Sequence, residues 1–202
     1  MVDFKNLISY ISILIILVSL IVILLNIQGL TGRVTDTAIV NITVESAASI
    51  NFTTDSIDFG NGTVSPGEPN ATLDTLGNVS GGTWVNISGG LFLENIGNIN
   101  VSLQLYSSQS AADFIGGTNP GYKYNFTSRD TETGSCANIT DLNFTLSTWY
   151  DFNSTDPGDL VCEVFGYADG NDSIRIDLEL VIPSDSKSGN LTDNIIATAT
   201  AR

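Results

Sequence analysis

Most of the chain alternates apolar and polar residues in short segments, in contrast to its uniformly apolar N-terminal part. The clearest segment is 173–182, where aliphatic residues occupy five successive even-numbered positions. Its odd-numbered positions hold Ser, Arg, Asp, Glu and Val. A period of two is typical of a β-strand with one buried and one exposed face. Residues 99–106 show the same pattern, with aliphatic side chains at the odd-numbered positions.

Short alternating segments recur along the rest of the chain and are separated by turn residues. NIGN at 95–98 and ADGND at 168–172 combine Asn or Asp with Gly, as tight hairpins require. No helical period follows the N-terminal block. Many short strands with regular turns predict an all-β domain, folded as an antiparallel sandwich. The predicted strands are 38–44, 48–53, 56–60, 83–88, 91–94, 99–106, 121–127, 142–149, 160–167, 173–182 and 193–200.

The N-terminal block predicts a single transmembrane helix. Residues 7–25 include no charge, and 15 of these 19 residues are Leu, Ile or Val. At 1.5 Å per residue such a helix spans about 28 Å, close to the hydrocarbon thickness of a bilayer. A buried core helix is disfavoured because the segment has no polar face. A cleaved secretory signal is the alternative, but NIQGLTGR at 26–33 offers no small-x-small cleavage site.

The expected organisation is therefore a short cytoplasmic N-terminus at 1–6, a signal anchor at 7–27, a linker at 28–37 and an extracytoplasmic sandwich at 38–202. Lys5 precedes the helix, but Asp3 and Arg33 weaken any orientation rule based on charge. The orientation instead follows from the glycosylation motifs, all of which lie beyond the helix.

One four-residue signature, in which an Asn stands between two apolar residues and is followed by Ser or Thr, occurs six times. It satisfies the strand period and also the N-glycosylation motif Asn-x-Ser/Thr, called a sequon below. Asn alternates with the apolar positions, so we expect it to point away from the core. The six copies are VNIT at 40–43, INFT at 50–53, VNIS at 85–88, INVS at 99–102, YNFT at 124–127 and LNFT at 142–145.

Sequons are more frequent than composition explains. After Asn26 the chain has 17 Asn, and 39 of its 176 residues are Ser or Thr. Random placement would give roughly 4 sequons, from the motif rule, whereas the chain has 13. The excess predicts an N-glycosylated protein outside the cytosol. The predicted sites are Asn41, Asn51, Asn61, Asn70, Asn78, Asn86, Asn100, Asn125, Asn138, Asn143, Asn153, Asn171 and Asn190.

The two cysteines, Cys136 and Cys162, predict one disulfide, since an even count in an oxidising compartment is typical of bonded pairs. A metal-binding pair is the alternative. It is disfavoured because the chain has no His and no other Cys to complete a soft ligand set.

The charge balance excludes several classes of function. With 7 basic and 22 acidic residues the net charge is −15, which disfavours nucleic acid and anionic lipid headgroups as partners.

The absence of His excludes Ser-His-Asp and Cys-His nucleophilic sites. No sequence feature marks two of the acids as a glycosidase pair, and the chain has no phosphate-binding loop. We expect no catalysis and no organic cofactor. Trp84 and Trp149 are expected to pack rather than to bind carbohydrate.

One segment could bind calcium. In DFNSTDPGD at 151–159, oxygen-bearing side chains occupy alternate positions, as in calcium loops. Two features disagree with that motif: position six is Asp instead of Gly, and position twelve is not Glu. A polar turn is therefore the expected alternative, and ADGNDS at 168–173 is a weaker candidate. The candidate ligands are Asp151, Asn153, Thr155, Asp156 and Asp159.

Three stretches, at 56–68, 91–105 and 182–201, resemble a known group of proteins. They read SIDFGNGTVSPGE, LFLENIGNINVSLQL and IPSDSKSGNLTDNIIATATA. Their order resembles that of signal-anchored surface β-sandwich proteins, a group that includes TasA and camelysin-like filament proteins and archaeal surface proteins. The resemblance implies a jelly-roll or immunoglobulin-like sandwich in an envelope or fibre, and it carries over no catalytic residue. The chain departs from the filament proteins because its anchor lacks a clear cleavage site.

The function expected from the sequence is that of a non-catalytic structural protein of the cell surface. It would be anchored in the cell membrane by one helix, with its C-terminal domain outside. The alternatives are a filament subunit in which a strand such as 38–44 completes a neighbour's sheet, a calcium- or glycan-dependent adhesin, and a hydrolase that the sequence does not reveal. The expected partners are the membrane, other copies or other envelope proteins. The sequon-free loop 107–121 is the expected contact surface, with Asp113 as its test residue.

Overall fold

The computed structural model describes residues 4–27, 37–129, 132, 134–137 and 148–202. The chain forms two compact units, Met1–Val44 and Glu45–Arg202, which are considered separately. The second unit is the β domain, and it begins at Glu45 rather than at residue 38.

The first unit contains one long helix, α1 (Phe4–Ile27). Its stretch Lys5–Leu25 is long and apolar enough to cross a membrane, and none of it is buried within the structure. The strand predicted at 38–44 does not form: residues 37–44 have no strand or helix assignment. The aliphatic side chains there, Ile39, Val40, Ile42 and Val44, are 75–89% exposed. The strand at 38–44 was predicted from alternation alone, and no strand among the described residues pairs with residues 37–44.

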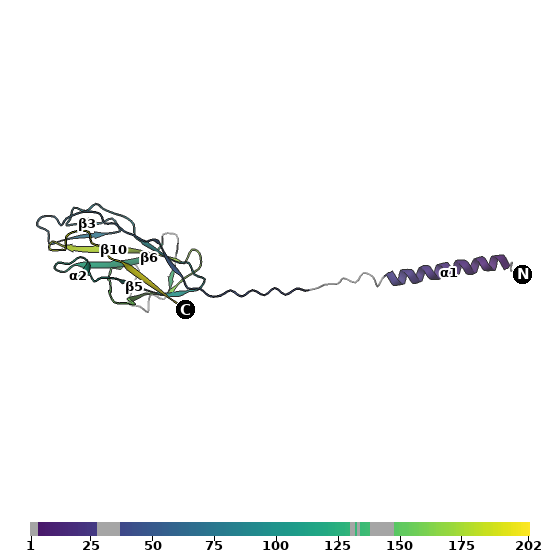
Figure 1. The fold of residues 1–202 in the computed structure, drawn as a ribbon. Helices are drawn as coiled ribbons and strands as arrows, with labels where there is room; N and C mark the ends of the chain where they lie inside the picture. The colour runs from purple at the N-terminus through teal and green to yellow at the C-terminus, as the bar shows by residue number, and fades with distance from the viewer. Residues whose placement is uncertain (1–3, 28–36, 130–131, 133, 138–147) are drawn as a thin grey trace. The chain divides into compact units, whose positions relative to one another are not determined.

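The β domain consists of two antiparallel sheets (Figure 1). The first, the large sheet, contains seven strands, and the second, the small sheet, contains four. The strands of the large sheet are β1 (Ile50–Thr54), β2 (Asn70–Asp74), β3 (Val79–Ser80), β4 (Leu91–Asn95), β6 (Gly121–Ser128), β8 (Tyr150–Asp151) and β10 (Ser173–Pro183). Those of the small sheet are β5 (Val101–Ser107), β7 (Cys136–Ala137), β9 (Asp159–Phe165) and β11 (Ile195–Ala201).

Strand β10 is the centre of the large sheet. On one side it pairs with β6 along residues 174–181. On its other side the first half pairs with β4 and the second half with β2. In the small sheet the order is β11-β5-β9-β7, so β11 is an edge strand. Figure 1 shows β6 and β10 side by side, with β5 in a separate layer.

The core lies between the sheets and follows the predicted alternation. Ile174, Ile176, Leu178 and Leu180 of β10 are all nearly or fully buried. The odd-numbered positions of β5 are buried opposite them, and Phe165 of β9 is fully buried. A second cluster surrounds the short helix α2 (Ala111–Phe114) and includes Leu73, Ile115 and Tyr122. The prediction of an all-β sandwich-like domain after an apolar helix is confirmed.

Two more predicted strands are absent. At 56–60, Ile57 and Phe59 pack on the core, but the Asp58 carboxylate accepts a hydrogen bond from the Gly60 amide and closes a turn. Residues 83–88 form only one isolated bridge, between Ser88 and Leu76. Strands β2 and β3 were not predicted at all. The predicted strand 142–149 lies mostly outside the described residues.

Candidate functional site

A cleft of about 1460 Å³ opens at one edge of the β domain. Its apolar base consists of inward-facing side chains of the large sheet, among them Leu91, Leu178 and Leu180. Phe52 of β1 and Ile195 of β11 also line it, and these strands are the edges of the two sheets. The cleft therefore lies where the sandwich is open between its edge strands.

Two loops form the polar rim of the cleft, residues 55–69 and 184–194. The polar groups of the rim mostly hold these loops in place. Lys187 donates a hydrogen bond to the carbonyl oxygen of Asp113. Asp193 accepts hydrogen bonds from the Ser108 hydroxyl and from the Gln109 amide. The hydrogen bonds of the described rim residues thus hold the loops together, and none of them pairs a nucleophile with a base.

Among the residues that the structure describes, Tyr122 is the one phenol that lines the cleft. Its side chain is nearly buried and packs against Phe114 and Phe152, with ring centroids 5.1 and 4.5 Å away. Burial first, and the charge of Asp193 second, raise the pKa of Tyr122 well above its usual value. The phenol therefore stays neutral at physiological pH and cannot serve as a base there.

The calcium candidates at 151–159 are not arranged as a metal site. Asp151 lies on the short strand β8, opposite Lys123. The side-chain oxygen of Asn153 accepts a hydrogen bond from the Thr155 amide, and its nitrogen donates to Asp159 at 3.3 Å. Asp156 is exposed and precedes a cis proline. Among the described residues, no three His, Cys, Asp or Glu side chains could hold a metal ion.

The weaker calcium candidate, residues 168–173, is a capped turn. One carboxylate oxygen of Glu132 accepts hydrogen bonds from the amides of Asp172 and Ser173, at 3.1 and 2.7 Å. Desolvation, followed by the charges of Glu132, Glu94 and Asp169, raises the pKa of Asp172. The charges of these neighbouring acids therefore disfavour ionisation of Asp172.

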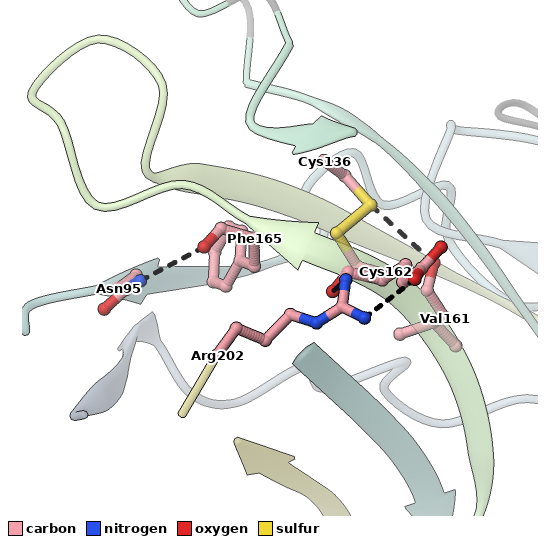
Figure 2. The surroundings of a disulfide bond; sticks show 7 residues. Asn95, Cys136, Val161, Cys162, Phe165 and Arg202 are labelled. Carbon is pink, nitrogen blue, oxygen red and sulfur yellow. Dashed lines mark hydrogen bonds and ion pairs between the residues drawn. A yellow bond between two sulfur atoms is a disulfide. The ribbon is translucent and has the colours of Figure 1, made fainter. Parts of the chain in front are cut away.

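The disulfide predicted from the two cysteines is present and joins β7 to β9 (Figure 2). The Cα atoms of Cys136 and Cys162 are 5.5 Å apart, and 26 positions separate them in the sequence. Cys162 is fully buried in the core. Figure 2 also shows Arg202 reaching β9, where its guanidinium binds Glu163 at 2.8 Å. The disulfide and this ion pair both act within the small sheet.

Most described sequons lie on the surface. Nine of their Asn side chains are exposed: Asn41, Asn51, Asn61, Asn70, Asn78, Asn86, Asn100, Asn171 and Asn190. Asn153 is half-buried, and Asn138 and Asn143 lie outside the described residues. Asn125 is different: it pairs with Asp177 of the central strand β10, and its side chain is only 5% exposed. A glycan on Asn125 would have to displace the groups that bury it, so the proposal below relies on the exposed sites.

The expected contact loop, 107–121, is well packed rather than loosely exposed. Ser110 caps α2 by accepting a hydrogen bond from the Asp113 amide at 3.1 Å. Ile115 is buried, and Thr118 donates two hydrogen bonds to Asp185, at 2.8 and 2.7 Å. Asp113 itself stays exposed. The prediction that this loop binds a partner stays a prediction.

Fold and surface together define a class: an all-β, sandwich-like domain with a disulfide, preceded by a helix long and apolar enough to span a membrane. No protein-family model, no curated protein and no solved structure matches the chain.

Proposed function

We propose that the protein is a non-catalytic structural component of a cell surface, held in the membrane by α1 and N-glycosylated on its β domain. The observation that carries this proposal is the placement of the sequons. Nine of the eleven that fall on described residues present an exposed Asn, and they are spread over strands and loops of the β domain and over the segment before it.

Three further features agree with an extracytoplasmic location. The disulfide is of the kind that persists in oxidising compartments. The net charge of −15 favours solubility and mutual repulsion rather than binding to polyanions. Helix α1 exposes apolar side chains all around, as a membrane-spanning helix does.

Mass spectrometry of the native protein, together with protease protection in sealed membrane vesicles, tests the proposal. We expect added glycan mass on several of the nine exposed Asn residues, an intact α1 and bonded cysteines. We also expect the β domain to be digested only from the outer side of the membrane. Bare asparagines and free thiols, with a domain accessible from the cytoplasmic side, would contradict the proposal.

A second role, assembly of copies by strand addition, is favoured by residues 37–44. This segment has eight residues without charge or proline, and its alternate positions 38, 40, 42 and 44 are all apolar. Such a segment has the composition of a strand, yet it lies exposed and unpaired. Exposed apolar strands of this kind pair with sheet edges of other chains.

A further inference from the structure

We propose, on the strand-addition role stated above, that residues 38–44 of one copy bind along the free edge of β11 in a second copy. The inserted strand would cover the open side of the sandwich. Four observations support this assignment: the chemistry of the edge, the direction of its free backbone groups, the cleft beside it, and the two faces of the inserted segment.

Strand β11 lacks the devices that usually protect a sheet edge. Its sequence, IIATATA, has no charge and no proline, and no sequon begins between residues 191 and 202. Its pairing with β5 is continuous over all seven residues, without a bulge. Natural sheets normally block edges with Lys, Pro or bulges. By comparison β1, the edge strand of the large sheet, is shorter, has an irregular register and carries the exposed Asn51.

The free backbone groups of β11 can be assigned from its register. The Arg202 amide donates to the Asn100 carbonyl oxygen, and the Ser108 amide donates to the Asn194 carbonyl oxygen. Hydrogen-bonded pairs alternate along an antiparallel ladder, so the even-numbered residues of β11 bond to β5. The amides and carbonyls at 195, 197, 199 and 201 therefore point toward the free edge. Among the described residues none of these groups has a partner.

An added strand would also find an apolar surface beneath it. Ile195, Ala197 and Ala199 pack on the core but remain partly exposed. At its Ile195 end, β11 borders the cleft, which Phe52 and Leu178 also line. The small alanines leave this rim of the core accessible to larger aliphatic groups.

The segment 38–44 matches such a site on both of its faces. Val40, Ile42 and Val44 share one face and would point toward the core. Asn41 and Thr43 share the other face, so a glycan on Asn41 would point to solvent. Burying the three aliphatic side chains would stabilise the added strand and oppose the entropy lost on ordering the segment.

A second copy is the favoured source of the strand. For its own segment to pair with β11, the chain would have to reverse near Glu45, where Val44–Ala47 contains no Gly, Pro, Asn or Asp. Asn98 also fixes the backbone there: its side chain donates to the Glu45 carbonyl at 2.8 Å and accepts from the Ala47 amide at 2.7 Å. The nine residues at 28–36 reach at most about 30 Å, so the partner would be a neighbour in the same membrane.

The test uses the full chain in vesicles of phosphatidylcholine. Both native cysteines are bonded, so an Ala168→Cys variant can be labelled with a dye at the exposed turn. Two differently labelled pools are mixed, and energy transfer between copies is measured against protein density. We expect transfer for the unmutated segment. Val40→Asp with Val44→Asp should weaken association at least tenfold, because two carboxylates would face the core.

Ile39→Asp is the matched control for the charged variant. Ile39 is as exposed as Val40 but lies on the opposite face, and neither change alters the sequon at Asn41. We expect Ile39→Asp to keep association within twofold. Ala199→Pro should block the acceptor, because it removes an outward amide and leaves the ladder to β5 intact. Its thermal unfolding midpoint checks that the domain still folds.

Mixing the two defective chains gives the most specific result. The Val40→Asp/Val44→Asp chain retains a normal β11, and the Ala199→Pro chain retains a normal segment, so the mixture should regain energy transfer. Association that ignores all these changes would overturn the assignment to β11 but leave a surface-assembly role in place. No transfer between unmutated copies would overturn both. Destabilisation of isolated chains by Val40→Asp, without transfer, would instead show that the segment pairs within its own chain and would overturn the proposal.

Discussion

The large sheet is organised around a central strand, whereas the small sheet is held by a covalent bond. In the large sheet β10 pairs with β6, β4 and β2, and its outward face carries a buried polar network. In the small sheet the Cys136–Cys162 disulfide joins the short strand β7 to β9, and β11 is paired on one side only. The disulfide therefore ties the two-residue edge strand β7 to the rest of the small sheet.

The polar network of the large sheet is centred on Asp177. Its carboxylate accepts hydrogen bonds from the Thr75 hydroxyl at 2.6 Å and from Arg175 at 2.8 Å. Thr75 also accepts a hydrogen bond from the Leu178 amide, at the gap between β2 and β4. Gly90 lies so close that a Cβ there would be 2.6 Å from the Ile176 carbonyl oxygen. The polar outward face of β10 is therefore buried at Ser173 and Asp177 and half-buried at Arg175 and Glu179.

The largest effect is expected from removing the covalent bond. Cys136→Ala together with Cys162→Ala should lower the free energy of unfolding by about 3–4 kcal/mol, from the loop-closure entropy of the unfolded chain. Urea denaturation measures the loss. Reducing the unmutated protein should produce a similar loss, whereas reductant should not affect the double variant. An unchanged denaturation midpoint would mean that the small sheet does not depend on the bond.

Disruption of the polar network should have the next largest effect. Asp177→Ala leaves the buried Thr75 hydroxyl without an acceptor and Arg175 without its counter-charge, so we expect a loss of about 2–4 kcal/mol. Asp55→Ala removes an exposed carboxylate and serves as control, with an expected change within about 0.5 kcal/mol. Equal denaturation midpoints for the two variants would show that the network adds no stability.

A third prediction contrasts two copies of one signature, YNFT in β6 and INFT in β1. Asn125→Gln adds a methylene at a packed position and should cost about 1–3 kcal/mol of stability without changing glycan mass. Asn51→Gln should change stability by less than about 0.5 kcal/mol and remove one glycan. Intact mass and thermal unfolding of both variants give the comparison. A glycan found on Asn125 would contradict the burial of that side chain.

The sequence predicted the positions of strands well wherever a period-two segment also pairs with a neighbouring strand. It located β5, β9, β10 and β11 to within a few residues, because alternating side chains pack only in one register. It failed at 38–44, where the same pattern has no partner, and at Asn125, whose outward side chain is only 5% exposed. Whether an outward face is exposed depends on which segments cover it, and local alternation does not encode that.

The cleft and the free edge of β11 could not be predicted from the sequence, for a similar reason. The cleft is lined by residues from β1, β2, β4, β6, β10 and β11, which come together only in the folded sandwich. Individually they are ordinary core residues such as Leu91 and Leu178. By contrast, the disulfide could be predicted because two cysteines allow only one intramolecular pairing.

The smallest predicted effect concerns the acids around the 168–172 turn, and its sign follows from the direction of the pKa shift. Desolvation and the charges of Glu132, Glu94 and Asp169 raise the pKa of Asp172 in the folded protein. Ionisation of Asp172 is therefore less favourable in the folded than in the unfolded state, so its contribution to stability is lost as the pH rises through the folded pKa. Asp172→Asn removes that loss. The variant should be slightly more stable than the unmutated protein at pH 7, and equally stable near pH 3.

Asp185→Asn provides the control of opposite sign. Hydrogen bonds from the Thr118 amide and hydroxyl lower the pKa of Asp185, so its stabilising contribution is present at neutral pH and is lost as the pH falls through the folded pKa. This variant should be less stable than the unmutated protein at pH 7, with the difference disappearing in acid. Thermal unfolding midpoints across the acidic range measure both. If the two variants shifted in the same direction at pH 7, the repulsion assigned to the acids around Asp172 would be wrong.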